Sequence, residues 1–346
     1  MSGKPRIGLV TDTAGWAFAN IARQLQRHLA SRFDFTVVPM ADLDNDITQT
    51  LLLTQDCDLV HFFWREHLRL IGAPEARAHV ERLGLTYDAF EARYVRTRKI
   101  TTGIYDHLLL DPAALAARAP LYRDLLAGYG VASRKLLACY AAAPGYPAPG
   151  ALLEDGVDLA LFRPRHLDRL GEIPGREMVI GWVGNSAWAA DIADFKGVHT
   201  LLNPAIARLR AEGYPVVPHF ADRQAGFIPH AEMPDYYAKI DLYVCMSKIE
   251  GTPNPILEAM ACGVPIVTTD VGIVPEAFGP LQRQFVLETR ALDALVEKLK
   301  TLLRTPTLLQ DLSAENRAAI APWDWRLKAL PFGDFFDAML KAAVPA

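Results

Sequence analysis

The regular alternation of short apolar runs with helix-length segments most constrains the fold of this chain. The runs are rich in branched and aromatic residues and bounded by turn residues, as in buried strands. Ala17–Ala30, between the first two runs, has apolar residues at helical spacing. This βαβ rhythm predicts parallel sheets with helices on both faces. The predicted strands are Ile7–Thr11, Phe35–Met40, Asp58–Phe63, Ile100–Tyr105, Leu136–Tyr140, Met178–Val183, Val216–Phe220, Leu242–Met246, Ile266–Thr269 and Phe285–Leu287.

The length of 346 residues predicts two domains, because it is about twice what one hydrophobic core usually serves. The segment Gly171–Glu177 is rich in glycine and proline, and the strand rhythm restarts just beyond it. We therefore expect a first domain over 1–172, a second over 173–321 and a terminal segment over 322–346. The predicted fold class is α/β, with two doubly wound Rossmann-like domains facing a central cleft at the carboxyl ends of their strands.

Composition excludes several classes of protein. Apolar residues make up 51% and charged residues 22%, as in a folded chain, and no apolar run is long enough to span a bilayer. The amino terminus lacks the layout of a signal peptide. The net charge of −4 disfavours a nucleic-acid partner. The four cysteines lie far apart without a CxxC pair, which argues against a zinc site and for a reducing, cytoplasmic compartment.

The usual catalytic motifs of α/β folds are missing. The chain contains no G-x-G-x-x-G after a strand, no P-loop and no G-x-S-x-G, so neither a nicotinamide enzyme, a P-loop NTPase nor a typical serine hydrolase is indicated. The acidic run Asp42, Asp44 and Asp46 precedes a helical pattern, and we interpret it as helix capping rather than as a metal site. No metal ligands are assigned.

The most informative segment is 240–276, in which a predicted strand ends in the loop Ser247–Asn254. Pro255 suits the first position of a helix, Thr252 or Asn254 can cap it, and Gly263 is a typical stop. The loop therefore presents a helix amino terminus at the carboxyl end of a strand. Its free amides and its dipole suit an anion such as a pyrophosphate.

Two glutamates flank this helix start. Glu250 lies in the loop and Glu258 one turn inside the helix, where carboxylates can accept hydrogen bonds from sugar hydroxyls. Each taken alone is explained as well by a solvated loop charge or by the helix dipole. Together, with the loop between them and the strand that follows, they favour a functional role.

Glu250 and Glu258 have the E-x7-E spacing, and EGTPNPILEAMACGVPIVTT resembles glycosyltransferase family 4, whose members are retaining and have the GT-B fold. The resemblance extends over 178–288, with support from Asp155–Pro164. It implies that 322–346 contains the family's terminal helix, which crosses back to the first, acceptor-binding domain, while the second domain binds the nucleotide-sugar. It also implies that Glu258 binds the nucleotide ribose and that Glu250 binds the hydroxyls of the donor sugar. The residues implied along the sugar and diphosphate are Gly251, Thr252, Pro253 and Asn254.

A second donor element is implied by GWVGNSAWAADIADFKG, where Gly184 ends a strand and Lys196 matches the phosphate-binding lysine of the family. Asn185 stands where the family usually has arginine, which removes one positive charge. Arg223 is a candidate substitute, with a solvated arginine as the alternative. Ile228 and the proline after it resemble the segment that contacts the base.

The first domain offers fewer matches. Gly15 and Trp16 follow the first strand, where the family has a glycine loop near the acceptor. Asp106 and His107 lie where the family often has a His-Asp pair, although Tyr105 takes the place of the histidine. His61 is the alternative acceptor contact, with a packed core histidine as the competing interpretation.

The stretch Arg93–Lys99 is basic. It suits a phosphorylated acceptor or an anionic lipid, while a solvated helix face is the simpler interpretation. A contact with a lipid surface would be peripheral.

The resemblance implies metal-independent transfer of a sugar from UDP-sugar or GDP-sugar to a hydroxyl of a glycan, lipid-linked or small-molecule acceptor, as in polysaccharide biosynthesis. The nucleotide-sugar is a co-substrate, and no cofactor is implied. Lys196, Glu250, Asp106 and His107 are the expected catalytic residues. The alternatives are a non-catalytic nucleotide-sugar-binding subunit and a GT-B epimerase or phosphorylase.

Overall fold

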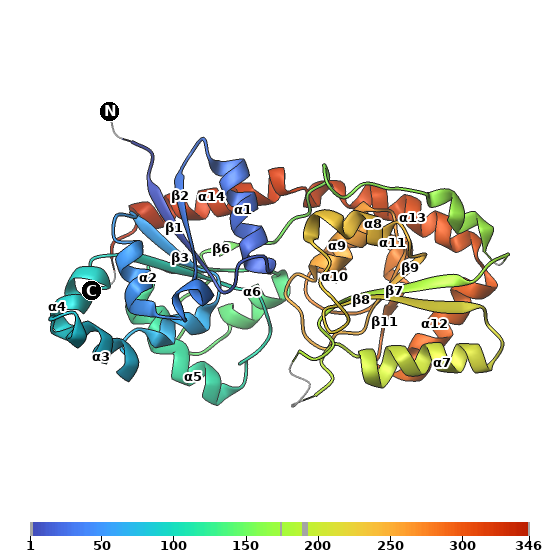
Figure 1. Ribbon diagram of the computed structural model, residues 1–346, viewed down its shortest axis with the longest axis horizontal. Coiled ribbons are helices and arrows are strands. Elements are labelled where there is room, and N and C mark those ends of the chain that lie inside the picture. Colours follow the sequence, from blue (N-terminus) through green and yellow to red (C-terminus); the bar gives the residue numbers. More distant parts are fainter. Residues whose placement is uncertain (1–2, 174, 189–192, 345–346) are drawn as a thin grey trace. The chain divides into compact units, whose positions relative to one another are not determined.

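The computed structural model describes residues 3–173, 175–188 and 193–344. The chain forms two compact units, which Figure 1 shows as separate α/β bodies. The first unit comprises Met1–Asp155 and Trp325–Ala346, and the second comprises Gly156–Asp324. Each unit is described by itself.

The first unit is built on a parallel sheet in the order β2-β1-β3-β4-β5-β6. Its strands are β1 (Arg6–Thr11), β2 (Asp34–Pro39), β3 (Leu59–Phe62), β4 (Lys99–Ile104), β5 (Gly128–Val131) and β6 (Ala151–Leu152). Its longer helices are α1 (Ala17–Leu29), α2 (Ile47–Leu53), α3 (Pro74–Arg82), α4 (Tyr87–Tyr94), α5 (Pro112–Pro120), α6 (Arg134–Ala141) and α14 (Trp325–Lys341). Shorter turns of helix are η1 (Met40–Leu43), η2 (Arg65–Leu70) and η3 (Leu121–Leu125).

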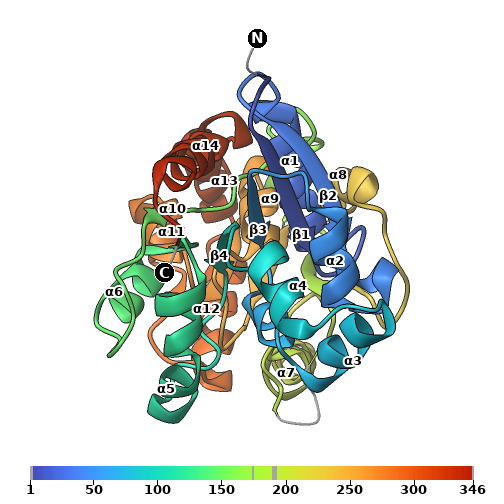
Figure 2. The same cartoon turned by 90° about the vertical axis from the view of Figure 1, so that its left-hand side faces the viewer.

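Both faces of this sheet are covered, as the apolar runs predict. Ile7, Leu9 and Leu59 pack with α1 and α14 on one face, and Val60 and Phe62 belong to the core cluster on the other. Successive residues of a strand therefore pack in the cores on opposite faces of the sheet. Figure 2 shows α1 and α14 on the same side of β1 and β3.

The terminal helix α14 is part of the first unit. Its side chains Trp325, Phe332 and Phe336 are buried among the residues of β1, β3 and α1. Arg32 at the end of α1 forms ion pairs with Asp334 (2.9 Å) and Asp337 (2.7 Å) on this helix. The helix is thus held by apolar burial and by charges at its rim.

One predicted strand is a helix. Leu136–Tyr140 lies within α6, which Ser133 caps by accepting a hydrogen bond from the amide of Leu136 at 3.2 Å. Leu136 and Tyr140 are four residues apart and are both buried, which is the spacing of one helix face. The strand at this place in the sheet is instead β5, whose sequence GYGV carries a weak strand signal.

The predicted capping role of the acidic run is confirmed at Asp46. Its carboxylate accepts hydrogen bonds from the amides of Thr48 (2.8 Å) and Gln49 (3.2 Å) at the start of α2. These amides have no partner inside the helix, so the aspartate satisfies them.

The second unit has a parallel sheet in the order β11-β10-β9-β7-β8. Its strands are β7 (Met178–Gly184), β8 (Val216–Asp222), β9 (Leu242–Cys245), β10 (Ile266–Thr269) and β11 (Val286–Leu287). Its helices are α7 (Asn203–Ala211), α8 (Met233–Tyr237), α9 (Asn254–Ala261), α10 (Val274–Ala277), α11 (Pro280–Arg283), α12 (Leu292–Arg304) and α13 (Thr307–Ala319), with short turns η4 (Leu167–Glu172), η5 (Val198–Leu202), η6 (His230–Glu232) and η7 (Ala321–Trp323).

The division between the units falls after residue 155, whereas the sequence placed it after residue 172. Residues 156–172 pack in the second unit, because Val157 pairs with Asp324 and Phe162 is buried in the cluster around α8 and α9. The glycine- and proline-rich segment therefore lies inside this unit. Arg176 within it donates to both carboxylate oxygens of the buried Asp241, each at 2.7 Å.

Candidate functional site

The loops that follow β7 and β9 meet at the carboxyl edge of the second sheet, because these two strands are neighbours. Lys196 comes from the first loop and Glu250 from the second, and the Lys196 Nζ donates to Glu250 Oε1 at 2.5 Å. Only 22% and 20% of the two side chains are exposed. Burial by itself would lower the pKa of Lys196, but the Glu250 carboxylate outweighs it, and the pKa is raised. The pair is therefore ionic.

The turn that holds Lys196 is rigid. Asp194 accepts hydrogen bonds from the amides of Gly197 (2.7 Å) and His199 (2.9 Å), and so caps η5. Arg290 donates to the carbonyls of Asp194 (2.6 Å) and Met246 (2.8 Å), which ties this turn to the end of β9. Arg290 stands far along the chain from both partners, and no sequence motif marks it.

The Glu250 loop is packed directly against the turn after β10. Gly272 has a φ of +50°, and a Cβ there would lie 1.8 Å from the carbonyl oxygen of Gly251. The Thr269 hydroxyl donates to the carbonyl of Ser247 at 2.6 Å. Gly272 is required for this close approach, because any side chain would displace the backbone of the loop.

The helix start differs in one respect from the prediction. Helix α9 begins at Asn254, and its capping position is Pro253, which makes no side-chain capping bond. The predicted cap Asn254 is thus wrong, because Asn254 is already helical, and Thr252 lies one residue before the capping position. The helix ends at Gly263, which has a φ of +73°, as predicted. Pro253 at the capping position has no side-chain acceptor for the first amides of α9, and such a helix start suits an anion.

Glu258 lies inside α9 and is only 8% exposed. Its Oε2 accepts a hydrogen bond from the Tyr237 hydroxyl at 2.8 Å, and its Oε1 lies 3.0 Å from His230 Nε2. Both partners lie in the segment between β8 and β9 and were missed by sequence reasoning. A glutamate this deeply buried is expected to need such partners.

The loop after β7 contains the asparagine found in place of arginine. The Asn185 side-chain oxygen accepts hydrogen bonds from Gln224 Nε2 (2.8 Å) and from the amide of Ala187 (3.1 Å). The carbonyl of Gly184 accepts from the amide of Arg223 at 2.9 Å. Asn185 therefore ties this loop to the loop after β8.

Arg223 is exposed, and its guanidinium lies 5.6 Å from the centre of the Phe227 ring. This placement matches the solvated alternative. Ile228 is partly buried and packs against the cluster that contains Tyr237. It is thus close to the elements that hold Glu258.

In the first unit, Asp106 is engaged by a buried arginine. Arg65, 3% exposed, donates to both carboxylate oxygens of Asp106 at 2.9 and 2.7 Å. Burial would lower the pKa of Arg65, but Asp106 raises it. Asp106 thus compensates a buried charge, and its predicted catalytic role stays a prediction. His107 follows it and is partly buried, and its predicted role stays a prediction.

His61 is a core residue. It is fully buried, its Nδ1 lies 3.0 Å from the Thr101 hydroxyl, and its ring packs edge-on against Phe63 and Phe336. Burial lowers the pKa of His61 to about 3. The structure therefore favours the core alternative over an acceptor contact.

Gly15 and Trp16 lie in the turn before α1. Gly15 has a φ of +81° and open space around it, and Trp16 is 40% exposed at the capping position of the helix. Both are accessible within the unit. Their contact with an acceptor stays a prediction.

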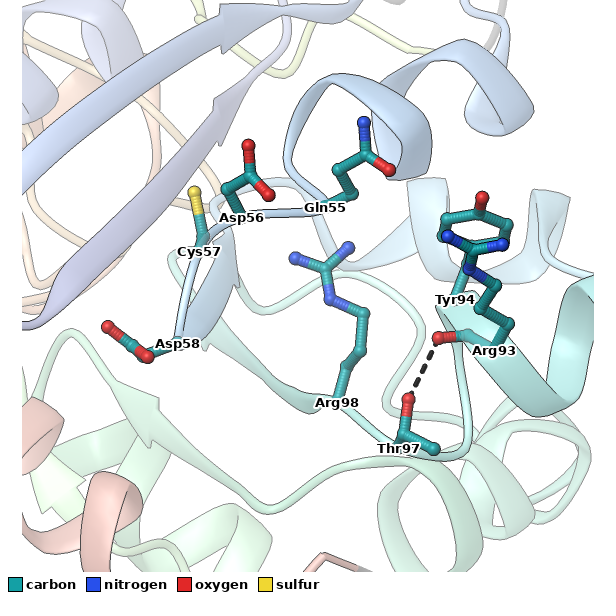
Figure 3. A pocket seen from close by; sticks show the side chains of 8 residues that line it. All are labelled: Gln55, Asp56, Cys57, Asp58, Arg93, Tyr94, Thr97 and Arg98. Atoms are coloured by element: carbon teal, nitrogen blue, oxygen red, sulfur yellow. Dashed lines mark hydrogen bonds between the residues drawn. The ribbon is translucent and has the colours of Figure 1, made fainter.

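The basic stretch Arg93–Lys99 lines a pocket at the amino ends of β3 and β4, at the opposite end of the sheet from Trp16 (Figure 3). Arg98 is 8% exposed there and donates to the carbonyls of Leu51 (3.0 Å) and Thr54 at the end of α2. Arg96 pairs with Glu91 at 2.6 Å. These arginines thus have structural partners inside the unit.

The described ranges contain neither a cluster that could bind a metal ion nor a helix that could span a membrane. Within residues 3–173, 175–188 and 193–344, no three or more His, Cys, Asp and Glu side chains gather in a geometry that could hold a metal ion. In the same ranges, no helix combines the length and the apolar character needed to cross a membrane.

The fold is GT-B, with two Rossmann-like α/β units. Among solved structures, HepE of Anabaena in complex with UDP and glucose matches with a TM-score of 0.68 and 15% identity, over 96% of this chain and 100% of that one. Sucrose-phosphate synthase of Thermosynechococcus elongatus matches with a TM-score of 0.64 and 17% identity, over 98% and 100%. Identities this low establish the fold alone.

Sequence comparison assigns the region around the site. Residues 223–319 match the family "Glycosyl transferases group 1". The MMP alpha-(1->4)-mannosyltransferase of Mycolicibacterium hassiacum is 31% identical over 193 residues, 49% of this chain and 44% of that protein. The O-antigen chain mannosyltransferase B of Escherichia coli is 31% identical over 103 residues, 30% of this chain and 26% of that protein. The matches span less than half the length of these relatives.

Substituting Gly272 tests the packing of the Glu250 loop. Gly272→Ala should accelerate amide hydrogen exchange in 247–254, because the new methyl group collides with the carbonyl of Gly251. Gly213→Ala is the matched control, since Gly213 also has a positive φ of +87° but nothing within 4 Å of a Cβ. Both variants should lose about 1 kcal/mol from the left-handed backbone. Equal rates of amide hydrogen exchange in 247–254 for the two variants would contradict the close contact between Gly272 and the carbonyl of Gly251.

His61 should make the first unit sensitive to acid. The unfolded chain protonates this histidine below pH 6.5, whereas the folded unit keeps it neutral down to about 3, so its contribution to stability is present above pH 6.5 and is lost as the pH falls. Between pH 6.5 and 4.5, wild type should lose about 2 kcal/mol more unfolding free energy than His61→Leu. Urea unfolding measures this, and the exposed His199→Leu should follow wild type.

Proposed function

We propose that this chain is a glycosyltransferase that moves a sugar from a nucleotide diphosphate-sugar to an acceptor hydroxyl. The observation that supports it best is the convergence of Lys196, Glu250 and the start of α9 at one edge of the second sheet. The site thus combines a cation, a carboxylate that can bind sugar hydroxyls and the first amides of a helix. The match of 223–319 to glycosyl transferases group 1 supports the same conclusion.

The difficult step is departure of the nucleotide diphosphate from C1 of the sugar. The bond from C1 to the phosphate oxygen breaks, the acceptor oxygen bonds to C1, and the proton of the acceptor hydroxyl passes to the leaving diphosphate. Lys196 and the first amides of α9 stabilise the charge that develops on the leaving diphosphate. Following the resemblance to family 4, we propose that the transfer retains anomeric configuration and proceeds without a metal ion.

Glu250 has two roles in this proposal. Without a ligand, it neutralises Lys196 across 2.5 Å. With the donor bound, a phosphate takes over this neutralisation, and the Glu250 carboxylate accepts hydrogen bonds from sugar hydroxyls. Lys196 is positively charged when the donor phosphate replaces Glu250 as its partner, because the pKa of Lys196 is raised. Glu258 is proposed to accept hydrogen bonds from the ribose.

Two nucleotides are the first candidates for the donor. The relatives above are named as mannosyltransferases, one further relative is named GDP-mannose-dependent, and the HepE structures hold UDP or UDP-glucose. The acceptor is proposed to be a glycan or a lipid-linked hydroxyl, as in polysaccharide assembly in the cytoplasm.

A second candidate is a nucleotide-sugar-binding subunit without catalytic activity. The neutral Asn185, bound to Gln224, favours it, because a missing arginine leaves the diphosphate less compensated. Donor binding with neither transfer nor slow hydrolysis of the donor would support this candidate.

Calorimetric titration with UDP, GDP, dTDP and ADP tests the donor site. One nucleotide should bind clearly better than the others, and Glu258→Ala should weaken it by about 10- to 100-fold, the effect of losing hydrogen bonds to a charged group. Glu177→Ala is the control, since Glu177 is exposed just before β7, at the far end of the strand. Binding of none of the four would remove the donor-site assignment.

Glu250→Gln should separate chemistry from nucleotide binding. Turnover should fall about 100-fold, because the carboxylate acts on the sugar in the transition state. Affinity for the nucleotide diphosphate should stay within about threefold, since Lys196 and the α9 amides are still present. Steady-state rates and calorimetry on the same sample measure both. Equal losses in the two quantities would contradict the division of roles between Glu250 and Glu258.

A further inference from the structure

The Glu258 carboxylate is held from two sides by side chains of one short segment. Tyr237, the last residue of α8, donates to Oε2 at 2.8 Å, and His230, the first residue of η6, lies 3.0 Å from Oε1. The two partners are seven residues apart, so one stretch of chain determines the orientation of both oxygens. Neither Tyr237 nor His230 takes part directly in the proposed reaction.

Tyr237 is fixed in place. Its ring is 1% exposed and packs against Phe162, Tyr236 and Tyr243 at centroid distances of 6.0, 5.4 and 6.4 Å. Burial, reinforced by the Glu258 charge, raises the pKa of Tyr237 well above its usual value. The hydroxyl therefore keeps its proton, and the ring cannot turn away from Glu258 without disrupting the core.

His230 connects Glu258 to the segment that resembles the base-contacting element. It follows Ile228 and Pro229 directly, and its ring packs edge-on against Phe162 at 5.2 Å. One third of the side chain (33%) is exposed, so it forms the accessible side of the arrangement, whereas Tyr237 forms the buried side. A movement of the 228–230 segment would therefore act directly on Glu258.

The geometry leaves capacity for a ligand. An ionised carboxylate has about four lone-pair positions, and Tyr237 and His230 use one on each oxygen. The two that remain match the two hydroxyls of a vicinal diol. The contacts with Tyr237 and His230 restrict the side-chain rotamer of Glu258 and, with it, the direction of these lone pairs.

We propose that Tyr237 and His230 are positioning residues that hold Glu258 in the orientation that accepts both ribose hydroxyls, so that the site selects ribonucleotide donors over 2′-deoxyribonucleotide donors. This inference rests on the proposed function of the site. It extends that function by identifying the class of donor and the source of the selectivity.

The test compares a ribonucleotide with its 2′-deoxy counterpart on several variants by calorimetry. The probe is UDP or GDP, whichever wild type binds better, and the measured quantity is the ratio of the two dissociation constants. Wild type should prefer the ribonucleotide by about tenfold or more, as expected for a hydrogen bond to a charged acceptor. Tyr237→Phe should reduce this ratio to about threefold or less, because Glu258 can then rotate.

Tyr236→Phe is the matched control. Tyr236 is equally buried beside Tyr237, but its hydroxyl donates to the carbonyls of Trp182 (2.9 Å) and His219 (2.7 Å) and not to Glu258. This variant should lose thermal stability while keeping the wild-type ratio. A role of Tyr237 in stability alone would predict the same behaviour for both variants.

His230 provides a second measurement that does not require a buried substitution. His230→Ala should lower the ratio, and His230→Gln should restore part of it, because a glutamine amide can donate from nearly the position of Nε2. An unchanged ratio in Tyr237→Phe and His230→Ala would overturn the inference, as would equal binding of the two nucleotides by wild type. If wild type binds no nucleotide, the proposed function itself fails.

Discussion

The parallel pairing of β7 with β9 is the constraint on which the candidate site depends. Parallel neighbours end at the same edge of a sheet, so the loop that contains Lys196 and the loop that contains Glu250 meet, although 54 residues separate them. Once the two loops are close, a partly buried ammonium and a partly buried carboxylate form an ion pair. Arg290 and Gly272 then hold the two loops at this distance, one by hydrogen bonds to carbonyls and the other by the absence of a side chain.

Buried polar groups in the two units have different consequences. In the first unit, Arg65 and Asp106 complete each other with two hydrogen bonds, and His61 is kept neutral by its apolar surroundings. In the second unit, Glu258 has a partner on each oxygen but retains accepting capacity. Arg65 and His61 lie in the core of the first unit and contribute to the fold, whereas the accepting capacity that Glu258 retains suits a ligand.

The places where sequence reasoning was wrong share a physical cause. Leu136–Tyr140 is apolar and short, and only the position of Ser133 and the packing of the helix distinguish it from a strand. The capping residue of α9 was misplaced by one position, because helix ends depend on local dihedral angles that several sequences tolerate. Arg65, the partner of Asp106, could not be predicted either, because it lies 41 residues earlier and nothing near Asp106 along the chain reveals it.

The sequence by itself determined the class of fold and indicated the principal residues of the candidate site. Strand and helix periodicity are local properties, and Glu250, Gly251 and Glu258 lie within one short segment whose spacing is readable directly. Tertiary structure alone decided which residues complete the site. Tyr237 and His230 reach Glu258, and Arg290 reaches the Lys196 turn, only after the sheet is assembled. Contacts between distant segments depend on strand order and burial, which no local pattern records.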